Sequence, residues 1–243
     1  MNNLLTKLKK YFDFVIKPYK FFIYPKKDFN YHKLCFSQEG EDILLERIFE
    51  NKTKGFYVDI GSHHPQRFSN TYNLYLKGWS GINIDPMPNS MQKFNQLRKR
   101  DTNLELGISS TKKTLNYYIF NETALNGFNK PLSLERDKLE NYEIIDIKEI
   151  DTFPLSEILN KYLPENKHID VMSIDVEGLD YQILESNDWD KYRPSIILVE
   201  EIEKVDLLSI NSSRIASFLI DREYIPYSKL FHTLIFIEKA FKI

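Results

Sequence analysis

Two short segments decide the fold of this chain: FYVDIGSHHP at residues 56–65 and GINIDP at residues 81–86. In each segment a run of apolar residues leads to an acidic side chain, and the first run also leads to Gly61. The second acid, Asp85, follows Gly61 by 24 positions. This spacing is typical of a nucleotide site on a parallel sheet. The first strand brings a tight glycine turn to the carboxyl edge, and the second brings an acid that can accept both ribose hydroxyls of an adenosine-containing ligand.

The turn after Gly61 differs from the dinucleotide-binding pattern. A dinucleotide fold has glycines at the second and third fingerprint positions, so that the backbone can approach a pyrophosphate. Here His63 occupies the second position, and bulky neighbours follow up to Pro65. A pyrophosphate would be crowded, so the sequence predicts a ligand that contains adenosine but no phosphates and disfavours a nicotinamide-dependent oxidoreductase.

Length and composition narrow the protein class. With 243 residues, 42% of them apolar, the chain can bury one core, which favours a single domain with elaborations. The net charge of −2 argues against a dedicated nucleic-acid binder. Cys35 is the single cysteine, which excludes an intrachain disulfide and fits a reducing compartment. No apolar run approaches the roughly 20 residues that span a bilayer, and lysines interrupt the N-terminal stretch, so we expect a cytoplasmic protein without a signal peptide.

Charge and aromatic residues set the first part of the chain apart. Residues 1–36 carry eight lysines and two aspartates, interleaved with aromatic and apolar side chains. We therefore predict a basic N-terminal arm over 1–36 and one α/β domain over 37–243. The arm could lie on an anionic membrane surface. Alternatively, it could pack on the domain or on a second subunit, with its lysines in water.

Strand-like and helix-like segments alternate after residue 36. Strands that are apolar on both faces and separated by helices predict a doubly wound, mostly parallel sheet with both faces covered. The segment 121–142 is polar and contains Gly127 and Pro131, which predicts a mobile loop or lid near the site. We predict strands at 56–60, 81–85, 103–109, 114–120, 170–175, 195–200 and 232–238, and helices at 37–50, 69–77, 88–100, 154–163, 179–187 and 211–223.

Acidic residues stand at the ends of four predicted strands. They are Asp59 with the nearby Gly61, Asp85, Asp175 with Glu177, and Glu200 with Glu201. A single acid there often caps the next helix, as Asp85 could do. Four such ends, with His63 and His64 after the first, predict a functional cluster, because ligands of an open parallel sheet lie outside the carboxyl ends. One histidine could act as a base near neutral pH, while the other could only hydrogen-bond the loop.

The segment Asp175-Val176-Glu177-Gly178 follows a fully apolar strand. In an extended backbone, Asp175 and Glu177 point to the same side, toward the mouth of the site. Asp175 could align or deprotonate an acceptor, and Glu177 could hold the acceptor or an amino group of the ligand. Asp175 could instead cap the next helix. With Glu200 and Glu201 it could also form an oxygen-rich Mg²⁺ or Ca²⁺ site, although a solvated acidic strand end is favoured over a bound metal.

These motifs, taken in order, resemble the FkbM family of S-adenosylmethionine-dependent methyltransferases. The resemblance runs from about Phe36 to Lys239 and implies a Rossmann-like sheet of the class I methyltransferase type with an antiparallel C-terminal strand. It implies S-adenosylmethionine as the cofactor, and acceptor-facing roles for Asp175 and Glu177. The motifs that carry it are residues 37–42, 59–65, 69–71, 78–86 and 173–178. The cofactor-binding residues that it implies, with their neighbours, are Gln38, Asp59, Gly61, Ser62, Asn70, Asp85, Pro86 and Asp175.

The resemblance also suggests an activity. It favours methyl transfer to a sugar hydroxyl, with a nucleotide-linked sugar precursor of surface polysaccharide as acceptor. Asp175, Glu177 and one of His63 and His64 are the candidates for moving or stabilising the acceptor proton. A non-catalytic protein that binds the cofactor and docks on membrane glycan machinery through residues 1–36 is an alternative. A homo-oligomer is compatible with the sequence.

Overall fold

A computed structural model describes residues 33–202 and 205–242 of the chain. The predicted N-terminal arm over 1–36 therefore lies, except for its last four residues, outside the described residues. From Cys35 onward, the described residues belong to one compact unit. None of the helices in the described ranges has the length and apolar character that crossing a bilayer requires.

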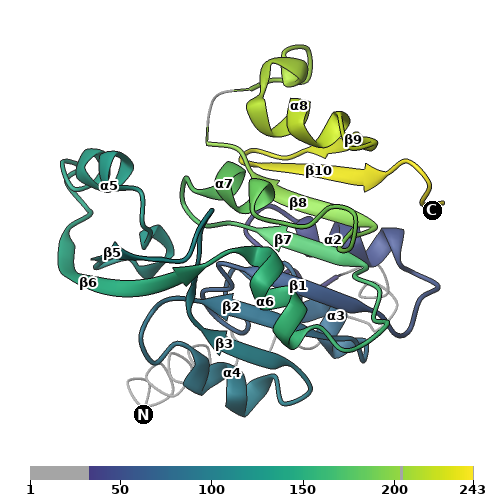
Figure 1. The fold of residues 1–243 in the computed structure, drawn as a ribbon, viewed down its shortest axis with the longest axis horizontal. Helices are drawn as coiled ribbons and strands as arrows, with labels where there is room; N and C mark the ends of the chain where they lie inside the picture. Colours follow the sequence, from purple (N-terminus) through teal and green to yellow (C-terminus); the bar gives the residue numbers. More distant parts are fainter. Residues whose placement is uncertain (1–32, 203–204, 243) are drawn as a thin grey trace, which may run out of the picture. The chain divides into compact units, whose positions relative to one another are not determined.

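A seven-stranded sheet forms the centre of this unit, with strand order β3-β2-β1-β7-β8-β10-β9 (Figure 1). Neighbouring strands from β3 through β8 are parallel, whereas β10 is antiparallel to both β8 and β9. The predicted Rossmann-like, mostly parallel sheet with an antiparallel C-terminal strand is thus confirmed. The strands are β1 (Phe56–Ile60), β2 (Ser80–Asp85), β3 (Thr102–Glu105), β7 (Val171–Ile174), β8 (Ile196–Glu200), β9 (Tyr224–Lys229) and β10 (Thr233–Glu238).

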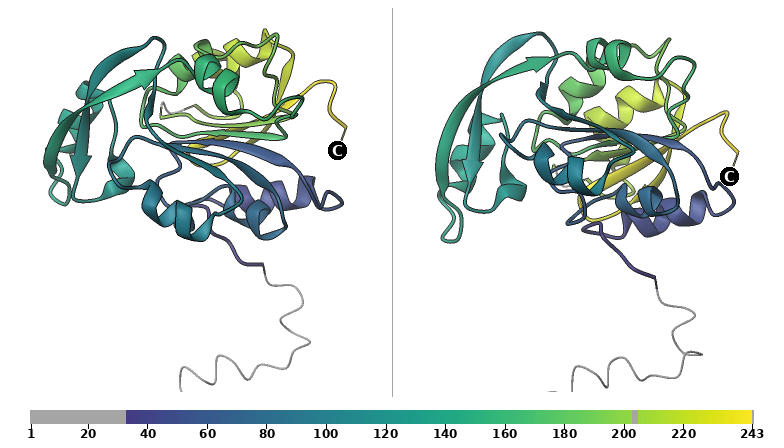
Figure 2. Two further views of the ribbon diagram at one scale, coloured as in Figure 1. Left: turned by 60° about the horizontal axis from the view of Figure 1, so that its bottom comes forward. Right: turned by 90° about the horizontal axis from the view of Figure 1, so that it is seen from below.

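Helices cover both faces of the sheet, as Figure 2 shows. Alternating residues of β1 separate the two layers, because Tyr57 packs with α2 and α3 while Val58 and Ile60 pack with α6, α7 and α8. A strand that is buried on both sides needs apolar residues at most positions, which is why β1, β7 and β8 are mostly apolar. The helices are α2 (Glu41–Ile48), α3 (Tyr72–Leu76), α4 (Met91–Leu97), α6 (Leu155–Tyr162), α7 (Asp180–Glu185) and α8 (Arg214–Ile220).

A second sheet of three strands, in the order β4-β6-β5, extends from the domain (Figure 1). Its strands are β4 (Gly107–Ile108), β5 (Lys113–Phe120) and β6 (Ile144–Phe153). The single strand predicted over 103–109 is wrong, because β3 pairs in the main sheet and β4 in the second one. β6 was not predicted, since most of its side chains are exposed and give no apolar run.

The segment between β5 and β6 corrects another prediction. Residues 121–142 were expected to be a loop or lid, but they contain the short 3-10 helix η2 (Thr123–Leu125) and the helix α5 (Lys130–Arg136). The Asn129 side chain caps α5 by accepting the N–H of Leu132, and Pro131 lies in the first turn, where proline needs no hydrogen-bond partner. The polar residues that suggested a loop therefore start a helix.

Candidate functional site

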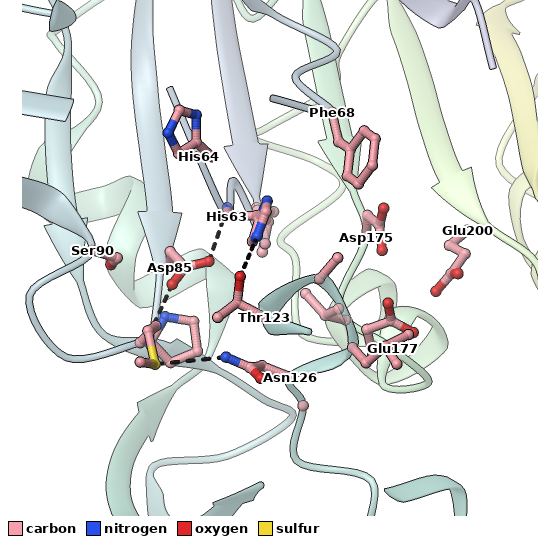
Figure 3. Close-up of a pocket in the computed structure, with 18 of the residues that line it drawn as sticks. His63, His64, Phe68, Asp85, Ser90, Thr123, Asn126, Asp175, Glu177 and Glu200 are labelled. Carbon is pink, nitrogen blue, oxygen red and sulfur yellow. Dashed lines mark hydrogen bonds between the residues drawn. The ribbon is translucent and has the colours of Figure 1, made fainter. Parts of the chain in front are cut away.

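A cavity of about 840 Å³ opens at the carboxyl ends of β1, β2, β7 and β8 (Figure 3). This volume is in the range of small-molecule sites. The segment from Glu122 to Phe128, which follows β5, supplies part of its wall. Among the residues that the sequence suggested, the following line the cavity: Gln38, Gly61, His63, His64, Asn70, Asp85, Pro86, Asp175, Glu177 and Glu200. Asp59, Ser62 and Glu201 are not among the lining residues.

The turn after β1 is held between the ends of two neighbouring strands. The N–H groups of Gly61 and Ser62 both donate to the carbonyl of Ile84 on β2, at 2.9 and 3.0 Å. On the other side, a Cβ built on Gly61 would lie 1.7 Å from the carbonyl oxygen of Asp175. Gly61 also has a φ of +79°, in the left-handed region that favours glycine. Only glycine therefore lets the β1 turn lie this close to the end of β7.

Asp59 and Ser62 support this turn from outside the cavity. The buried Asp59 carboxylate accepts the Thr71 hydroxyl at 2.6 Å, just before α3. Burial raises the pKa of Asp59, while the bond from Thr71 opposes that shift. The Ser62 hydroxyl donates to the Ile84 carbonyl at 3.3 Å. The structure thus gives both side chains partners within the protein.

Asp85 lies at the end of β2 and faces the cavity. Its Oδ2 accepts the N–H of His63 and its Oδ1 accepts that of Met87, both at 2.9 Å. Burial raises the pKa of Asp85 to about 6, against the lowering effect of these two bonds. Each carboxylate oxygen keeps a further lone pair for a ligand hydroxyl. Asp85 does not cap the next helix, because α4 begins after Ser90.

The two histidines have partners in the loops around the cavity. His63 Nε2 lies 2.9 Å from the Thr123 hydroxyl of η2. Burial and the nearby charge of Arg67 lower the pKa of His63 to about 4, so its ring is neutral at pH 7. His64 Nδ1 accepts the N–H groups of Gln66 and Arg67, at 3.1 and 3.0 Å. His64 therefore shapes the turn, while His63 connects it to η2.

A second connection across the cavity wall is the ion pair between Arg67 and Glu122. The two guanidinium nitrogens donate to the two carboxylate oxygens at 3.0 and 2.9 Å. This bidentate bond lowers the pKa of Glu122. Phe68 follows Arg67 with a φ of +57°, and the residue is 41% exposed and lines the cavity. A bulky residue rarely adopts this backbone conformation, and such strain is concentrated at functional sites.

Asp175 follows β7, and its N–H donates to the carbonyl of Ile60 at 3.0 Å. Its side chain is deep in the protein but exposed to the cavity. Burial and the neighbouring carboxylate of Glu177 hold the pKa of Asp175 well above its usual range. The alternative that Asp175 caps α7 is wrong, because α7 begins five residues later. Asp180, in the first turn of α7, accepts the N–H groups of Val176 and Gly178 with its side chain.

Glu177 has a cationic partner that the sequence did not predict. Arg136, at the end of α5, lies 2.6 Å from the Glu177 carboxylate, and both side chains are mostly buried. Burial raises the pKa of Glu177, and the Arg136 charge opposes that shift. No local pattern connects positions 41 residues apart, so the signal for this pair lies only in the packing of α5 against the cavity.

The two glutamates after β8 point in different directions. Glu200 lines the cavity, with a carboxylate oxygen within 4.8 Å of oxygens of Asp175 and Glu177. Glu201 is buried elsewhere and accepts the Ser213 hydroxyl at the start of α8. Only Glu200 can therefore act with Asp175 on a ligand.

Asn70 and Gln38 complete the lining near the end of β1. The Asn70 amide donates to the Ser173 hydroxyl of β7 at 3.1 Å. This bond fixes Asn70 at the cavity wall, close to the strand that leads to Asp175. Gln38 comes from the segment just before α2. The sequence-predicted residues that line the cavity thus come from five separate parts of the chain: 38, 61–70, 85–86, 175–177 and 200.

Comparison with known proteins agrees with this geometry. No curated protein matches the sequence. The family model of the methyltransferase FkbM domain matches residues 59–224, which is more than half of the chain. The match extends from β1 to the first residue of β9, so it includes the ends of β1, β2, β7 and β8 that surround the cavity. The chain therefore belongs to the FkbM family of methyltransferases.

Proposed function

We propose that this protein is an S-adenosylmethionine-dependent O-methyltransferase that acts on a sugar hydroxyl. The observation that carries the proposal is a single cavity with Asp85 at one end and the acidic group of Asp175 and Glu177 at the other. The sugar class, a nucleotide-linked precursor of surface polysaccharide, rests on the family resemblance. We place the reaction in the cytoplasm, with which the single Cys35 is compatible.

The residues around Asp85 fit the adenosine part of S-adenosylmethionine. The carboxylate of Asp85 can accept ribose hydroxyls, and apolar side chains beside it offer a surface for an adenine ring. His63 and Pro65 occupy the turn where a pyrophosphate would need bare backbone, and the proposed cofactor has no phosphate. The apolar lining residues of the cavity include Met87, Leu106, Ile108 and Phe128.

The opposite end of the cavity fits the charge of the cofactor. S-adenosylmethionine carries a positive sulfonium and a positive amino group, which acidic side chains attract. Besides Asp175 and Glu177, the cavity lining includes Glu39 and Glu41, and the charge of Glu41 acts on the Asp175 carboxylate. We propose that Gln38 and Asn70 contact the methionine part here, as the family resemblance implies.

The cofactor supplies a methyl group already activated for displacement by its bond to sulfur. The protein then has to hold the acceptor oxygen in line with that methyl group, in a cavity with little water. We propose that the Asp175 carboxylate accepts a hydrogen bond from the hydroxyl group of the sugar. It then takes up the proton of that hydroxyl as negative charge grows on the sugar oxygen. Burial raises the pKa of Asp175 above that of an ordinary carboxyl, which makes its carboxylate a stronger proton acceptor. Arg136 holds Glu177 in place beside it.

Phe68 offers an apolar surface for the acceptor. The residue is 41% exposed and lines the same cavity as Asp175 and Glu177. The C–H faces of a sugar ring pack well on an aromatic ring, so Phe68 is our candidate for acceptor specificity. Contact of residues 1–36 with a membrane and formation of a homo-oligomer stay predictions.

Two measurements test the proposed function. Thermal unfolding with S-adenosylmethionine, S-adenosylhomocysteine or NAD should show stabilisation by the first two ligands alone. Release of S-adenosylhomocysteine with a panel of nucleotide sugars should then identify an acceptor. Stabilisation by NAD alone would favour an oxidoreductase. Cofactor binding with no turnover on any sugar would favour a non-catalytic protein.

Replacing Asp85 with alanine should weaken binding of S-adenosylmethionine about 100-fold, because charge-assisted hydrogen bonds to both ribose hydroxyls are worth about 3 kcal/mol together. Isothermal titration calorimetry measures this change. Glu105→Ala is the matched control, since Glu105 also ends a strand and accepts a backbone N–H, from Asn89 at 2.9 Å, but does not line the cavity. Equal affinities for Asp85→Ala and the wild type would remove Asp85 from the cofactor site.

Affinity for S-adenosylmethionine should also fall as the pH drops below about 6. The pKa of Asp85 is about 6 in the folded protein. Below that pH the carboxyl is protonated and loses acceptor capacity for the ribose hydroxyls, so affinity should decrease by up to tenfold per pH unit. Calorimetry between pH 5 and 8 measures the profile. Asp85→Asn should bind more weakly and show a flatter profile, and an unchanged slope would assign the titration to another group.

A further inference from the structure

Three carboxylates meet at the acceptor end of the cavity, and one arginine forms an ion pair with them within the described ranges. Asp175 and Glu177 follow β7, and Glu200 ends β8, the neighbouring parallel strand. One oxygen from each lies within 4.8 Å of the others, and Figure 3 shows the three carboxylates directed toward a common space. Arg136 pairs with Glu177 at 2.6 Å. If all three acids are ionised, this group carries two uncompensated negative charges.

Glu200 provides an independent observation. Its Oε2 atom is buried and has no hydrogen-bond partner within the described chain. A buried carboxylate oxygen without a partner is costly, and native proteins usually satisfy such an atom with a donor, an ion or a proton. The next residue, Glu201, is also buried but accepts the Ser213 hydroxyl. Of these two neighbouring glutamates, the one that faces the cavity is therefore the one whose buried oxygen lacks a partner.

We propose that Asp175, Glu177 and Glu200 bind one divalent cation of the oxygen-preferring kind, such as Mg²⁺ or Mn²⁺. Hard cations prefer carboxylate oxygens, and a charge of +2 balances the two uncompensated charges of this cluster. The cation also supplies the partner that Glu200 Oε2 lacks. Binding of the cation does not depend on the proposed function. Its role does, because a cation beside the acceptor would polarise the hydroxyl and assist loss of its proton.

Protons are the competing occupants of this cluster. Burial and mutual repulsion raise the pKa of Glu200 well above its usual range, with Asp175 the largest source of repulsion. The cluster could thus be neutralised by protonation instead. The two states differ in a measurable way, because only the ionised cluster gains from a divalent cation at neutral pH.

The test is binding of Mn²⁺ to the full chain, measured by electron paramagnetic resonance at pH 7.5. The wild type should bind one Mn²⁺, and Mg²⁺ should compete for it. Glu200→Gln should lower the affinity at least tenfold, because it removes one charged ligand with little change in shape. Glu201→Gln is the matched control. It should bind Mn²⁺ like the wild type, since Gln can still accept the Ser213 hydroxyl.

Thermal unfolding gives a second measurement that does not depend on catalysis. At the same concentration, Mn²⁺ should raise the Tm of the wild type and of Glu201→Gln more than that of Glu200→Gln. Without cation, Glu200→Gln should be at least as stable as the wild type, because it removes repulsion between buried acids. If Glu200→Gln does not fold, Asp175→Asn takes its place in both measurements.

Two results would overturn the cation site: no Mn²⁺ bound to the wild type at millimolar concentration, or equal affinity in Glu200→Gln and the wild type. Titration of S-adenosylmethionine into the same samples keeps this outcome separate from the proposed function. Cofactor binding without Mn²⁺ binding removes only the cation. If the protein binds Mn²⁺ but not S-adenosylmethionine, the cation site stands and S-adenosylmethionine is ruled out as the cofactor.

Discussion

Asp175→Asn should lower turnover by about 10²–10⁴-fold while leaving affinity for S-adenosylmethionine within a few-fold of wild type. The range is that of losing a general base, and an amide of the same shape cannot take up the acceptor proton. Asp175 is exposed to the cavity. Within the described chain, the neighbouring groups that act on its carboxylate do so through their charges and not through hydrogen bonds. The substitution should therefore disturb little of the fold. Initial rates of S-adenosylhomocysteine release with a saturating acceptor measure the effect.

The chelator response separates two ways in which Asp175 could act. If it binds a cation with Glu200, the wild type should lose activity with a chelator and regain it with Mg²⁺, whereas Asp175→Asn should respond weakly to both. If it acts only as a base, the wild type should be insensitive to chelation. Asp190→Asn, at an exposed position away from the cavity, is the control for removing an acid. Turnover near the wild-type value in Asp175→Asn would remove Asp175 from the catalytic residues.

The main sheet could be predicted because its signals are local. The central parallel strands β1, β2, β7 and β8 are short, mostly apolar runs, and an acidic or glycine residue at or just after the end marks the carboxyl end of each. Since these ends meet at one edge of a sheet, Gly61, Asp85 and Asp175 could be placed together without knowing any contact. In the second sheet, β5 was predicted at 114–120, but β6 gave no such signal. β6 exposes most of its side chains, so its alternation of apolar and charged residues is weak.

The direction of individual side chains was harder to predict. Asp59 was expected at the cofactor, but it lies on the same face of β1 as Tyr57 and points toward Thr71 rather than into the cavity. Glu200 and Glu201 similarly point to opposite sides, as neighbours in a strand do. The sequence shows this alternation but not which side holds the cavity. Arg136 could not be predicted, because its contact with Glu177 depends on how α5 packs.

Gly61→Ala should reduce the free energy of unfolding by about 2–5 kcal/mol and eliminate detectable binding of S-adenosylmethionine. An alanine in the left-handed region costs about 1–2 kcal/mol, and forcing extra atoms into a packed site costs about 1–3 kcal/mol more. The new Cβ would lie 1.7 Å from the Asp175 carbonyl oxygen and 2.7 Å from its carbonyl carbon, which are backbone atoms that no rotamer change can move. Urea denaturation and calorimetry measure the two effects.

Gly78→Ala is the control that separates backbone strain from this contact. Gly78 has a φ of +99°, but an alanine methyl group at this position would lie 3.7 Å from its nearest neighbour, the Thr53 carbonyl oxygen, which is an ordinary contact. Gly78→Ala should therefore lose only the strain energy and still bind the cofactor. If Gly61→Ala lost no more stability than Gly78→Ala and bound S-adenosylmethionine normally, the close approach of β1 to β7 would be needed neither for stability nor for cofactor binding. The extra loss in Gly61→Ala, together with lost binding, would instead show that this approach positions Asp175 and the cofactor turn as one unit.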